Sequence, residues 1–526
     1  MGSSEQNAAG PVIFERSMRR NVIAAALNLA VVLPCVYLIA RVFLLTEAPY
    51  DSWSLLLGVL LLASEGFVVF HSIAYALDVA SSLGRKEPPK QGIADWNQAP
   101  SVAILVPARH EPREVLDATF TCLTNLDYPN KTIYFLDDSS DEQYKREAEE
   151  LAEEYGAVLF RREVRHGAKA GILNDCIKGL SEKYIAVFDS DQHPIPGFLR
   201  DVIPILEANE RLAFVQTPQF YTNIDESPVA FAANLQHCIF YEHICGGKSA
   251  SGAMICCGTN VVLRREALVD VGGFDERSVT EDFSTSVDFI GRGWQSFYFD
   301  RVCAFGQGPE TLLPYLKQQW RWSRGNLGVL WKLLRYLVTR PFSLKLRQWW
   351  EFTGTGSYYL IGWAYFVLML CPISYVVFGV PSFYMAPPVY LLTFVPYFSL
   401  SVVLFYTSMQ RRYYRPGKLL RALMLGFTAI PIYMKAAVGA LFNWTAPFKV
   451  TQKGKGATTP LRVFWPQILL WLINAVGLVW GANLLLLDFN WPVAMCMVWI
   501  FYHLFLFSGV FYFQGARDSH GEAQPA

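Results

Sequence analysis

One run of this chain, Phe352–Gln410, has no charged side chain at all. A helix needs about 20 apolar residues to cross the roughly 30 Å hydrocarbon core of a bilayer. Prolines near the centre divide the run into Tyr358–Val380 and Val389–Met409, and each part is long enough to cross. Because a soluble domain does not contain such a run, the sequence predicts a transmembrane hairpin here.

Two more hairpins are predicted, because apolar stretches also occur in pairs near both ends of the chain. They are Val22–Ala40 with Trp53–Leu77, and Val463–Leu487 with Trp491–Phe513. The composition agrees, since 52% of the residues are hydrophobic and only 17% are charged, which is unlike a soluble protein. Leu419–Phe442 is apolar too, but it contains basic residues and lies between basic stretches, so we interpret it as an amphipathic helix on the membrane surface. We therefore expect about six spans.

Basic residues indicate which side of the membrane the loops occupy. They flank the predicted hairpins but are absent from the short loops within them, so the positive-inside rule makes both termini and the central region cytoplasmic. We expect a multi-pass protein of a plasma membrane, or of a bacterial inner membrane. Arg41, at the outer end of the first span, is expected to snorkel, and Glu65 and His71 to face protein or a channel. The expected segments are a tail (1–20), a hairpin (21–80), a central cytosolic domain with interfacial helices (95–345), a hairpin (352–410), an interfacial helix and loop (411–461), a hairpin (462–514) and a tail (515–526).

Charge and cysteine content exclude other classes of protein. Lys plus Arg and Asp plus Glu each number 45, so the balance favours no nucleic-acid partner. The ten cysteines form no pairs with metal-site spacing. No early apolar segment is followed by a small-residue cleavage site, so we expect no removed signal peptide.

The central region alternates strand-like and helix-like runs, which predicts an α/β domain with a mostly parallel sheet. The strand-like runs are Ser101–Val106, Thr132–Leu136, Val158–Arg161, Tyr184–Phe188 and Leu212–Gln216; the helical ones include Pro112–Asn125 and Asp141–Tyr155. Ligands of such sheets bind beyond the carboxyl ends of the strands. Acidic residues follow two of these runs directly, so the sequence predicts a cleft that contains both groups.

The first two acidic motifs are typical of nucleotide and metal sites. Asp137 and Asp138 end a strand, where they could accept hydrogen bonds from a base or ribose, although a turn or helix cap would also explain them. Asp189 and Asp191 follow the next strand and offer hard oxygen ligands to Mg²⁺ or Mn²⁺.

Two further motifs are expected on helices. Glu281 and Asp282 begin a helical run, where carboxylates also occur simply to stabilise a helix start. Gln318, Arg321 and Trp322 are spaced to share one helix face, and a Trp here could equally mark a membrane boundary.

In their order and spacing, with apolar helices on both sides, these motifs resemble the membrane-embedded family 2 glycosyltransferases, nearest to cellulose synthase catalytic subunits and related β-glucan synthases. The resemblance covers nearly everything from Val22 to Phe513. It implies a nucleotide-sugar-binding GT-A domain inserted in a transmembrane helical bundle, UDP-glucose as donor, Mg²⁺ or Mn²⁺ as cofactor, and a growing polysaccharide that leaves through a channel between the helices.

The resemblance also implies roles for individual residues. Asp282, with Glu281 beside it, would be the general base, Asp191 and Asp189 would hold the metal, and Trp322 would form a platform under the acceptor sugar. Phe448–Gly454 resembles a loop that closes over the nucleotide sugar, although a basic loop on anionic lipid is the alternative. The implied substrate-binding residues are Glu111, Asp137, Asp138, Lys169, Asp189, Gln216, Cys257, Gly258, Thr259, Gln318, Arg321, Trp322, Phe448, Val450, Thr451 and Lys453.

The chain also departs from the family pattern. Ala108–Glu111 replaces the usual Thr-Tyr-Asn-Glu, which puts the aromatic contact to the base in doubt. Ile255 and Cys256 replace an aromatic pair beside the acceptor, so we expect a tilted sugar and a β-1,3 (curdlan-like) or mixed-linkage glucan ahead of cellulose. No cyclic-di-GMP-binding domain is expected after Phe513. Rival hypotheses are a non-processive transferase to a lipid carrier and a non-catalytic transporter or scaffold. Accessory secretion subunits stay open.

Overall fold

The computed structural model describes residues 10–47, 49–83, 89–90, 92–385, 387–409, 416–442, 444 and 459–521. The chain divides into two units, which are described separately. The first comprises Met1–Gly84, Trp363–Lys418 and Trp471–Leu504, and the second comprises Arg85–Gly362, Leu419–Leu470 and Phe505–Ala526.

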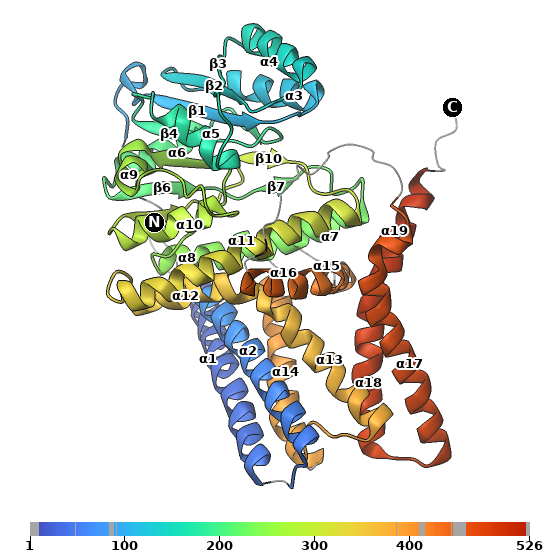
Figure 1. The fold of residues 1–526 in the computed structure, drawn as a ribbon. Helices are drawn as coiled ribbons and strands as arrows, with labels where there is room; N and C mark the ends of the chain where they lie inside the picture. The colour runs from blue at the N-terminus through green and yellow to red at the C-terminus, as the bar shows by residue number, and fades with distance from the viewer. Residues whose placement is uncertain are drawn as a thin grey trace, which may run out of the picture. The chain divides into compact units, whose positions relative to one another are not determined.

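A seven-stranded sheet forms the centre of the second unit (Figure 1). Its strands, in spatial order, are β3 (Val158–Phe160), β2 (Lys131–Asp137), β1 (Val102–Ala108), β4 (Tyr184–Val187), β8 (Val261–Arg264), β6 (Leu212–Gln216) and β9 (Gln295–Tyr298). Only β8 runs antiparallel to its neighbours. The predicted mostly parallel sheet is confirmed, and β8 and β9 are additions that the sequence pattern did not predict.

Apolar side chains on both faces of the sheet explain why its strands read as continuous hydrophobic runs. In β1, Ile104 packs on one face and Leu105 on the other, and both are fully buried. The first face is covered by α3 (Arg113–Thr124), α4 (Glu142–Tyr155) and α6 (Phe198–Glu207). The second is covered by α5 (Ala168–Ile177) and α9 (Arg265–Val271).

A second, three-stranded sheet extends the unit. It consists of β5 (His193–Pro194), β10 (Ala304–Gly306) and β7 (Phe220–Tyr221), with β10 in the middle. Its short strands carry the chain from the carboxyl ends of β4 and β6 past the site described below.

Helices pack below the main sheet in Figure 1. They are α7 (Pro228–Ile239), α8 (Cys245–Ala250), α10 (Glu281–Gly291), α11 (Leu312–Thr339), α12 (Leu346–Ser357), α15 (Pro416–Thr428) and α16 (Ile430–Leu441). The segment expected to be one amphipathic helix is therefore two, α15 and α16, which are separated at Ala429. The α16 helix packs on α11, and the Tyr433 hydroxyl donates a hydrogen bond to Gln319 Oε1 at 2.7 Å.

The remaining helices are apolar over most of their length. They are α1 (Gly10–Glu47), α2 (Ser52–Leu83), α13 (Ile361–Phe378), α14 (Pro387–Met409), α17 (Trp465–Leu487), α18 (Trp491–Phe507) and α19 (Gly509–Gly521). The exceptions are the amino-terminal part of α1 and the carboxyl-terminal part of α19. By length and composition, seven stretches of the described chain could cross a membrane, which agrees with a multi-pass membrane protein. One of the seven is Gly417–Leu441, the α15–α16 segment, so six spans and the side of each loop stay predictions.

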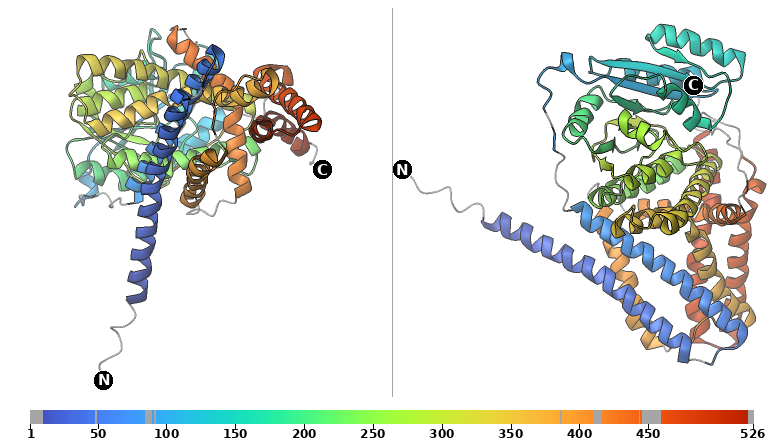
Figure 2. Two further views of the ribbon diagram at one scale, coloured as in Figure 1. Left: turned by 90° about the horizontal axis from the view of Figure 1, so that it is seen from below. Right: turned by 60° about the vertical axis from the view of Figure 1, so that its left-hand side comes forward.

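The first unit corrects our expectation for Arg41. Helices α1 and α2 lie side by side (Figures 1 and 2), and Arg41 Nε donates to Glu65 Oε2 at 2.8 Å. Tyr37 donates to the other carboxylate oxygen at 2.7 Å. The Arg41 side chain is only 4% exposed, so it does not snorkel. The ion pair and the Tyr37 hydrogen bond offset part of the cost of burying both charges, so Glu65 has its partners within the protein.

Candidate active site

A cavity of about 880 Å³ opens in the second unit at the carboxyl ends of β1 and β4. This is where ligands of open α/β sheets bind, and the volume suits a ligand of several rings. The cavity brings together residues that the sequence analysis selected from segments far apart in the chain. Those that line it are Glu111, Asp138, Lys169, Asp189, Asp191, Cys257, Gly258, Glu281, Asp282, Gln318, Arg321 and Trp322.

Other predicted site residues do not line the cavity or lie outside the described chain. Gln216 is fully buried, and its amide donates to the carbonyl oxygen of Thr259 while its Oε1 accepts from Cys257 N, both at 2.8 Å. Thr259 is 1% exposed. These two buried residues therefore stabilise the loop that contains Cys257 and Gly258 and do not themselves reach a ligand. The predicted contacts Phe448, Val450, Thr451 and Lys453 lie outside the described residues.

Arginines hold the first acidic pair. Asp138 is held by Arg162 through two hydrogen bonds of 2.9 Å and by Arg165 Nε at 2.8 Å. Asp137, which does not line the cavity, accepts from Arg161 Nε at 2.7 Å and from Ser139 N at 3.0 Å. A bidentate guanidinium fixes a carboxylate in orientation as well as position. Of the pair, only Asp138 remains in the cavity wall.

The loop after β1, where the chain departs from the family pattern, places the Arg109 side chain in the cavity wall. His110 has a left-handed backbone (φ 53°), which is costly for a residue with a Cβ. Its conformation is fixed because Ser140 N donates to His110 Nε2 at 2.9 Å and His110 N donates to Ser139 Oγ at 3.1 Å. Arg109 lines the cavity, and its buried Nε has no partner among the described residues. Burial, and then Arg165, lower the pKa of Arg109.

The second acidic pair is held through its backbone, so that its carboxylates stay in the cavity. Thr119 Oγ1 donates to the Ser190 carbonyl at 2.7 Å, and Asp189 N donates to Thr259 Oγ1 at 2.9 Å. Lys169 Nζ bonds both Asp189 Oδ1 and, at 2.8 Å, the Gly258 carbonyl. Asp191 is 9% exposed. No group of three or more potential metal-ligating side chains occurs in the described part of the chain, so a divalent ion here would need further oxygen ligands from a substrate, as Mg²⁺ commonly does.

The third acidic pair begins α10. Asp282 Oδ1 accepts from the backbone N–H of Phe283 at 2.7 Å. Burial, and then the neighbouring Glu281, raise the pKa of Asp282 to about 7, and burial raises that of Glu281 too. Gly258, at φ +78°, passes so close that a Cβ there would lie 2.9 Å from Asp282 Oδ2. Asp282 is therefore the carboxylate best suited to exchange a proton near neutral pH.

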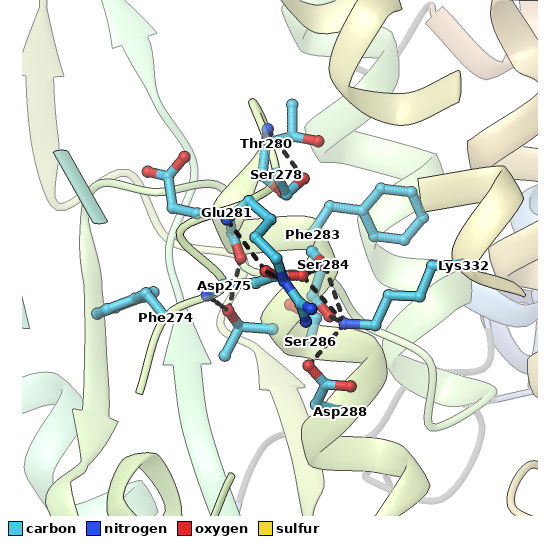
Figure 3. A network of polar contacts seen from close by, with 12 residues as sticks. Phe274, Asp275, Ser278, Thr280, Glu281, Phe283, Ser284, Ser286, Asp288 and Lys332 are labelled. Atoms are coloured by element: carbon cyan, nitrogen blue, oxygen red, sulfur yellow. Dashed lines mark hydrogen bonds and ion pairs between the residues drawn. The ribbon is translucent and has the colours of Figure 1, made fainter. Parts of the chain in front are cut away.

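Close packing and a partly buried cation, Lys332, fix α10 against α11. A Cβ on Gly325 would lie 2.3 Å from Thr280 Cγ2, so only glycine permits this approach. Further along α11, Lys332 points into α10 (Figure 3) and bonds Ser284 Oγ at 2.9 Å and Asp288 Oδ2 at 2.6 Å. Ser284 Oγ donates to Asp275 Oδ2 at 2.7 Å. The helix that carries Asp282 is thus tied to the helix that carries Arg321.

The face of α11 predicted from spacing is confirmed, because Gln318, Arg321 and Trp322 all line the cavity. Arg324 Nη2 on the same helix donates to the Trp444 carbonyl at 2.7 Å. Trp444 and Lys435 also belong to the cavity wall. Sequence analysis missed these two residues, and it missed Tyr221, because their places in the wall depend on packing that no local pattern records.

The structure removes the basis of our linkage prediction. Ile255 and Cys256 are 7% and 2% exposed and pack in hydrophobic clusters rather than in the cavity wall. Only the next residue, Cys257, lines the cavity. These two side chains therefore do not set the tilt of a bound sugar.

Comparison with known proteins agrees with this geometry. Residues 184–407 match the family model described as glycosyl transferase family group 2. Over this region, which is less than half of its length, the chain is similar to family 2 glycosyltransferases. The match begins at β4 and includes the second and third acidic pairs and the cavity face of α11.

Cellulose synthases are among the curated proteins to which this chain is similar. It is 29% identical over 331 residues to putative cellulose synthase 2 of Komagataeibacter xylinus, covering 61% of this chain and 21% of that protein. It is 27% identical over 456 residues to the UDP-forming cellulose synthase 1 catalytic subunit of the same organism (83% and 58%), and 25% identical over 527 residues to the Pseudomonas fluorescens catalytic subunit (94% and 67%). The chain thus spans less than two thirds of the length of the first two relatives.

A solved structure shows that the fold is of the GT-A type. A mannosyltransferase from Pyrobaculum calidifontis, in complex with GDP-mannose and Mn²⁺, superimposes with a TM-score of 0.52 at 16% identity, covering 74% of this chain and all of that one. At this identity the likeness concerns the fold alone.

Proposed function

We propose that this chain is a processive, inverting β-glucan synthase that transfers glucose from UDP-glucose to a growing polysaccharide. The observation that carries the proposal is the presence of Asp138, Asp191, Asp282 and Trp322 in the wall of one cavity. Seven stretches of the described chain are also long and apolar enough to cross a membrane. The similarity to cellulose synthase catalytic subunits supports the proposal. The product would leave the cytoplasmic side through the apolar helices.

Asp282 is the proposed general base. It takes the proton of the acceptor hydroxyl while that oxygen forms a bond to the anomeric carbon of glucose and the bond from that carbon to UDP breaks. A raised pKa suits this task, because a base is most effective when its pKa lies near the working pH. Trp322 offers an aromatic face to the acceptor, and Arg321 offers two-pronged hydrogen bonding to phosphate.

The donor set fits a divalent metal ion. Asp189 and Asp191 are hard oxygen ligands in the cavity wall, and two carboxylates completed by a diphosphate form a common arrangement for Mg²⁺ or Mn²⁺. When bound, the ion would neutralise charge on the diphosphate. Lys169, beside Asp189, supplies a further positive charge that orients the same group.

A donor screen tests the proposal. Purified protein is supplied with UDP-glucose, UDP-galactose, UDP-N-acetylglucosamine or GDP-mannose, and nucleotide release and product are measured. We expect UDP-glucose to support polymer synthesis. A labelled lipid-linked monosaccharide would instead indicate a non-processive transferase, and no turnover with any donor would indicate a non-catalytic protein.

The same product decides the linkage. Because Ile255 and Cys256 lie outside the cavity wall, a β-1,4 glucan fits the geometry as well as a β-1,3 or mixed-linkage glucan. Digestion with linkage-specific glucanases and methylation analysis separate the products. Any of them is compatible with the proposed reaction, whereas an α-linked product would contradict inversion.

A further inference from the structure

Tyr221 is a cavity residue to which the proposed reaction gives no role. It ends β7, is 3% exposed and lines the cavity. A Cβ on Gly308 would lie 2.6 Å from its ring, so the ring is held tightly in place. Burial raises the pKa of Tyr221, Asp191 adds to the rise, and Gln318 and Arg321 oppose it. Its hydroxyl is therefore neutral and lies among the residues proposed to hold the diphosphate and metal.

His237 of α7 lies behind this hydroxyl. Its Nε2 is 3.1 Å from Tyr221 Oη, and the two rings are 4.6 Å apart. His237 also packs against Trp322: the two ring centroids are 5.6 Å apart and the ring planes are at 32°. Burial lowers the pKa of His237 to about 4, so the imidazole is neutral at working pH.

The surroundings of His237 select its tautomer. Nδ1 is buried and has no hydrogen-bond partner in the described part of the chain. If Nδ1 carried the proton, a buried N–H would be left unpaired, and such donors are rarer in proteins than unpaired acceptors. With the proton on Nε2, the imidazole donates to Tyr221 Oη. The Tyr221 O–H is then free to donate into the cavity.

We propose that Tyr221 is a further substrate-contacting residue, whose hydroxyl, oriented by neutral His237, donates a hydrogen bond to the diphosphate of the nucleotide donor. This inference rests on the proposed function, because it needs a diphosphate beside Asp191 and Arg321. Such a bond strengthens as charge develops on the departing UDP. His237 acts through Tyr221 and is a positioning residue.

The test uses the full-length protein and two readouts, turnover and affinity for UDP. Tyr221→Phe keeps the ring but removes the donor, so we expect turnover to fall on the order of 10²-fold and UDP to bind several-fold more weakly, roughly the loss of one charge-assisted hydrogen bond. The matched control is Tyr315→Phe. It removes another buried hydroxyl of the same unit, which donates to Gln236 Oε1 at 2.9 Å, and turnover per folded protein should change less than about twofold.

Variants of His237 separate positioning from packing. His237→Phe keeps a ring against Trp322 but cannot donate, so it should behave like Tyr221→Phe. His237→Gln places an amide N–H near the position of Nε2 and should retain more activity than His237→Phe. The double variant Tyr221→Phe/His237→Phe should lose no more turnover than either single variant, because the effects of two residues that act through one hydrogen bond are not additive.

The outcomes separate this inference from the proposed function. If the wild type turns over UDP-glucose and Tyr221→Phe matches it in rate and UDP affinity, the inference is wrong and the function stands. If the fold-loss of turnover in the double variant equals the product of the two single losses, His237 does not act through Tyr221 and the inference is wrong in that part. If the wild type binds no nucleoside diphosphate, both fail together.

Discussion

Two pairs of adjacent acids, each with at least one member in the cavity wall, have opposite surroundings. Asp137 and Asp138 are bound by three arginines, whereas Glu281 and Asp282 have raised pKa values because burial is not offset by comparable positive charge. Lys169 is the cation that lowers both of the latter pKa values most strongly. A sequence shows the same residue type twice, and only the neighbours distinguish a fixed anion from a proton acceptor.

This difference suggests a division of labour. Carboxylates that arginines hold in place are suited to position a nucleotide, and one with a pKa near neutrality is suited to take a proton. Changing one pair at a time should therefore affect nucleotide binding and turnover separately.

The largest expected effect is that of Asp282→Asn. The amide keeps the shape of the carboxylate but cannot accept the acceptor proton, so turnover should fall by about 10²–10⁴-fold. UDP affinity should stay within about threefold, because Asp282 does not hold the nucleotide. Turnover and UDP binding are measured on the same preparation. If the variant keeps more than about a tenth of the activity, Asp282 is not the base.

Asp138→Ala should act on binding and stability instead. It leaves Arg162, whose side chain is 5% exposed, without its bidentate partner, and unpairing a buried charge costs about 3–5 kcal/mol. We expect a lower thermal midpoint and weaker UDP binding. The control is Asp127→Ala, which breaks an exposed pair with Arg200 worth about 0–1 kcal/mol. An unchanged UDP affinity in a folded Asp138 variant would contradict the division of labour.

Gly325→Ala tests whether Asp282 depends on the contact between α10 and α11. The new Cβ would lie 2.3 Å from Thr280 Cγ2, so α10 must shift, and misplacing a base by about 1 Å can cost up to 10²-fold. We expect about a tenfold loss of turnover. Gly328→Ala on the same helix is the control, since its Cβ would meet nothing within 4 Å. Equal activity of the two variants would show that this contact does not position Asp282.

The smallest effect is the pH dependence of the wild type. Asp282 accepts a proton only when ionised, so with a pKa of about 7 the turnover should rise by up to about tenfold between pH 6 and 8 and then level off. Initial rates at saturating UDP-glucose measure this. A rate that is flat from pH 5 to 8 would mean that no base with a raised pKa limits the reaction.

Much of the fold and part of the site could be predicted from the sequence. Apolar runs placed β1, β2 and β4 correctly, and acids marked the carboxyl ends of β2 and β4, because these patterns are local. The orientation of Ile255 and Cys256 and the partner of Arg41 could not be predicted, since each depends on a neighbour distant in the chain. For the same reason the contact between Tyr221 and His237 could not be predicted, since they meet only because β7 and α7 pack together.

The central claim is that this cavity builds a polymer, and one measurement tests it most directly. Purified wild-type protein in lipid nanodiscs is given radiolabelled UDP-glucose with Mg²⁺ or Mn²⁺, and the label is separated by size and by solvent extraction. The account predicts label in a high-molecular-weight β-glucan, and about 10²–10⁴-fold less with the Asp282→Asn variant in parallel. Label that is confined to a lipid-soluble monosaccharide, or polymer formed equally by the variant, would contradict it.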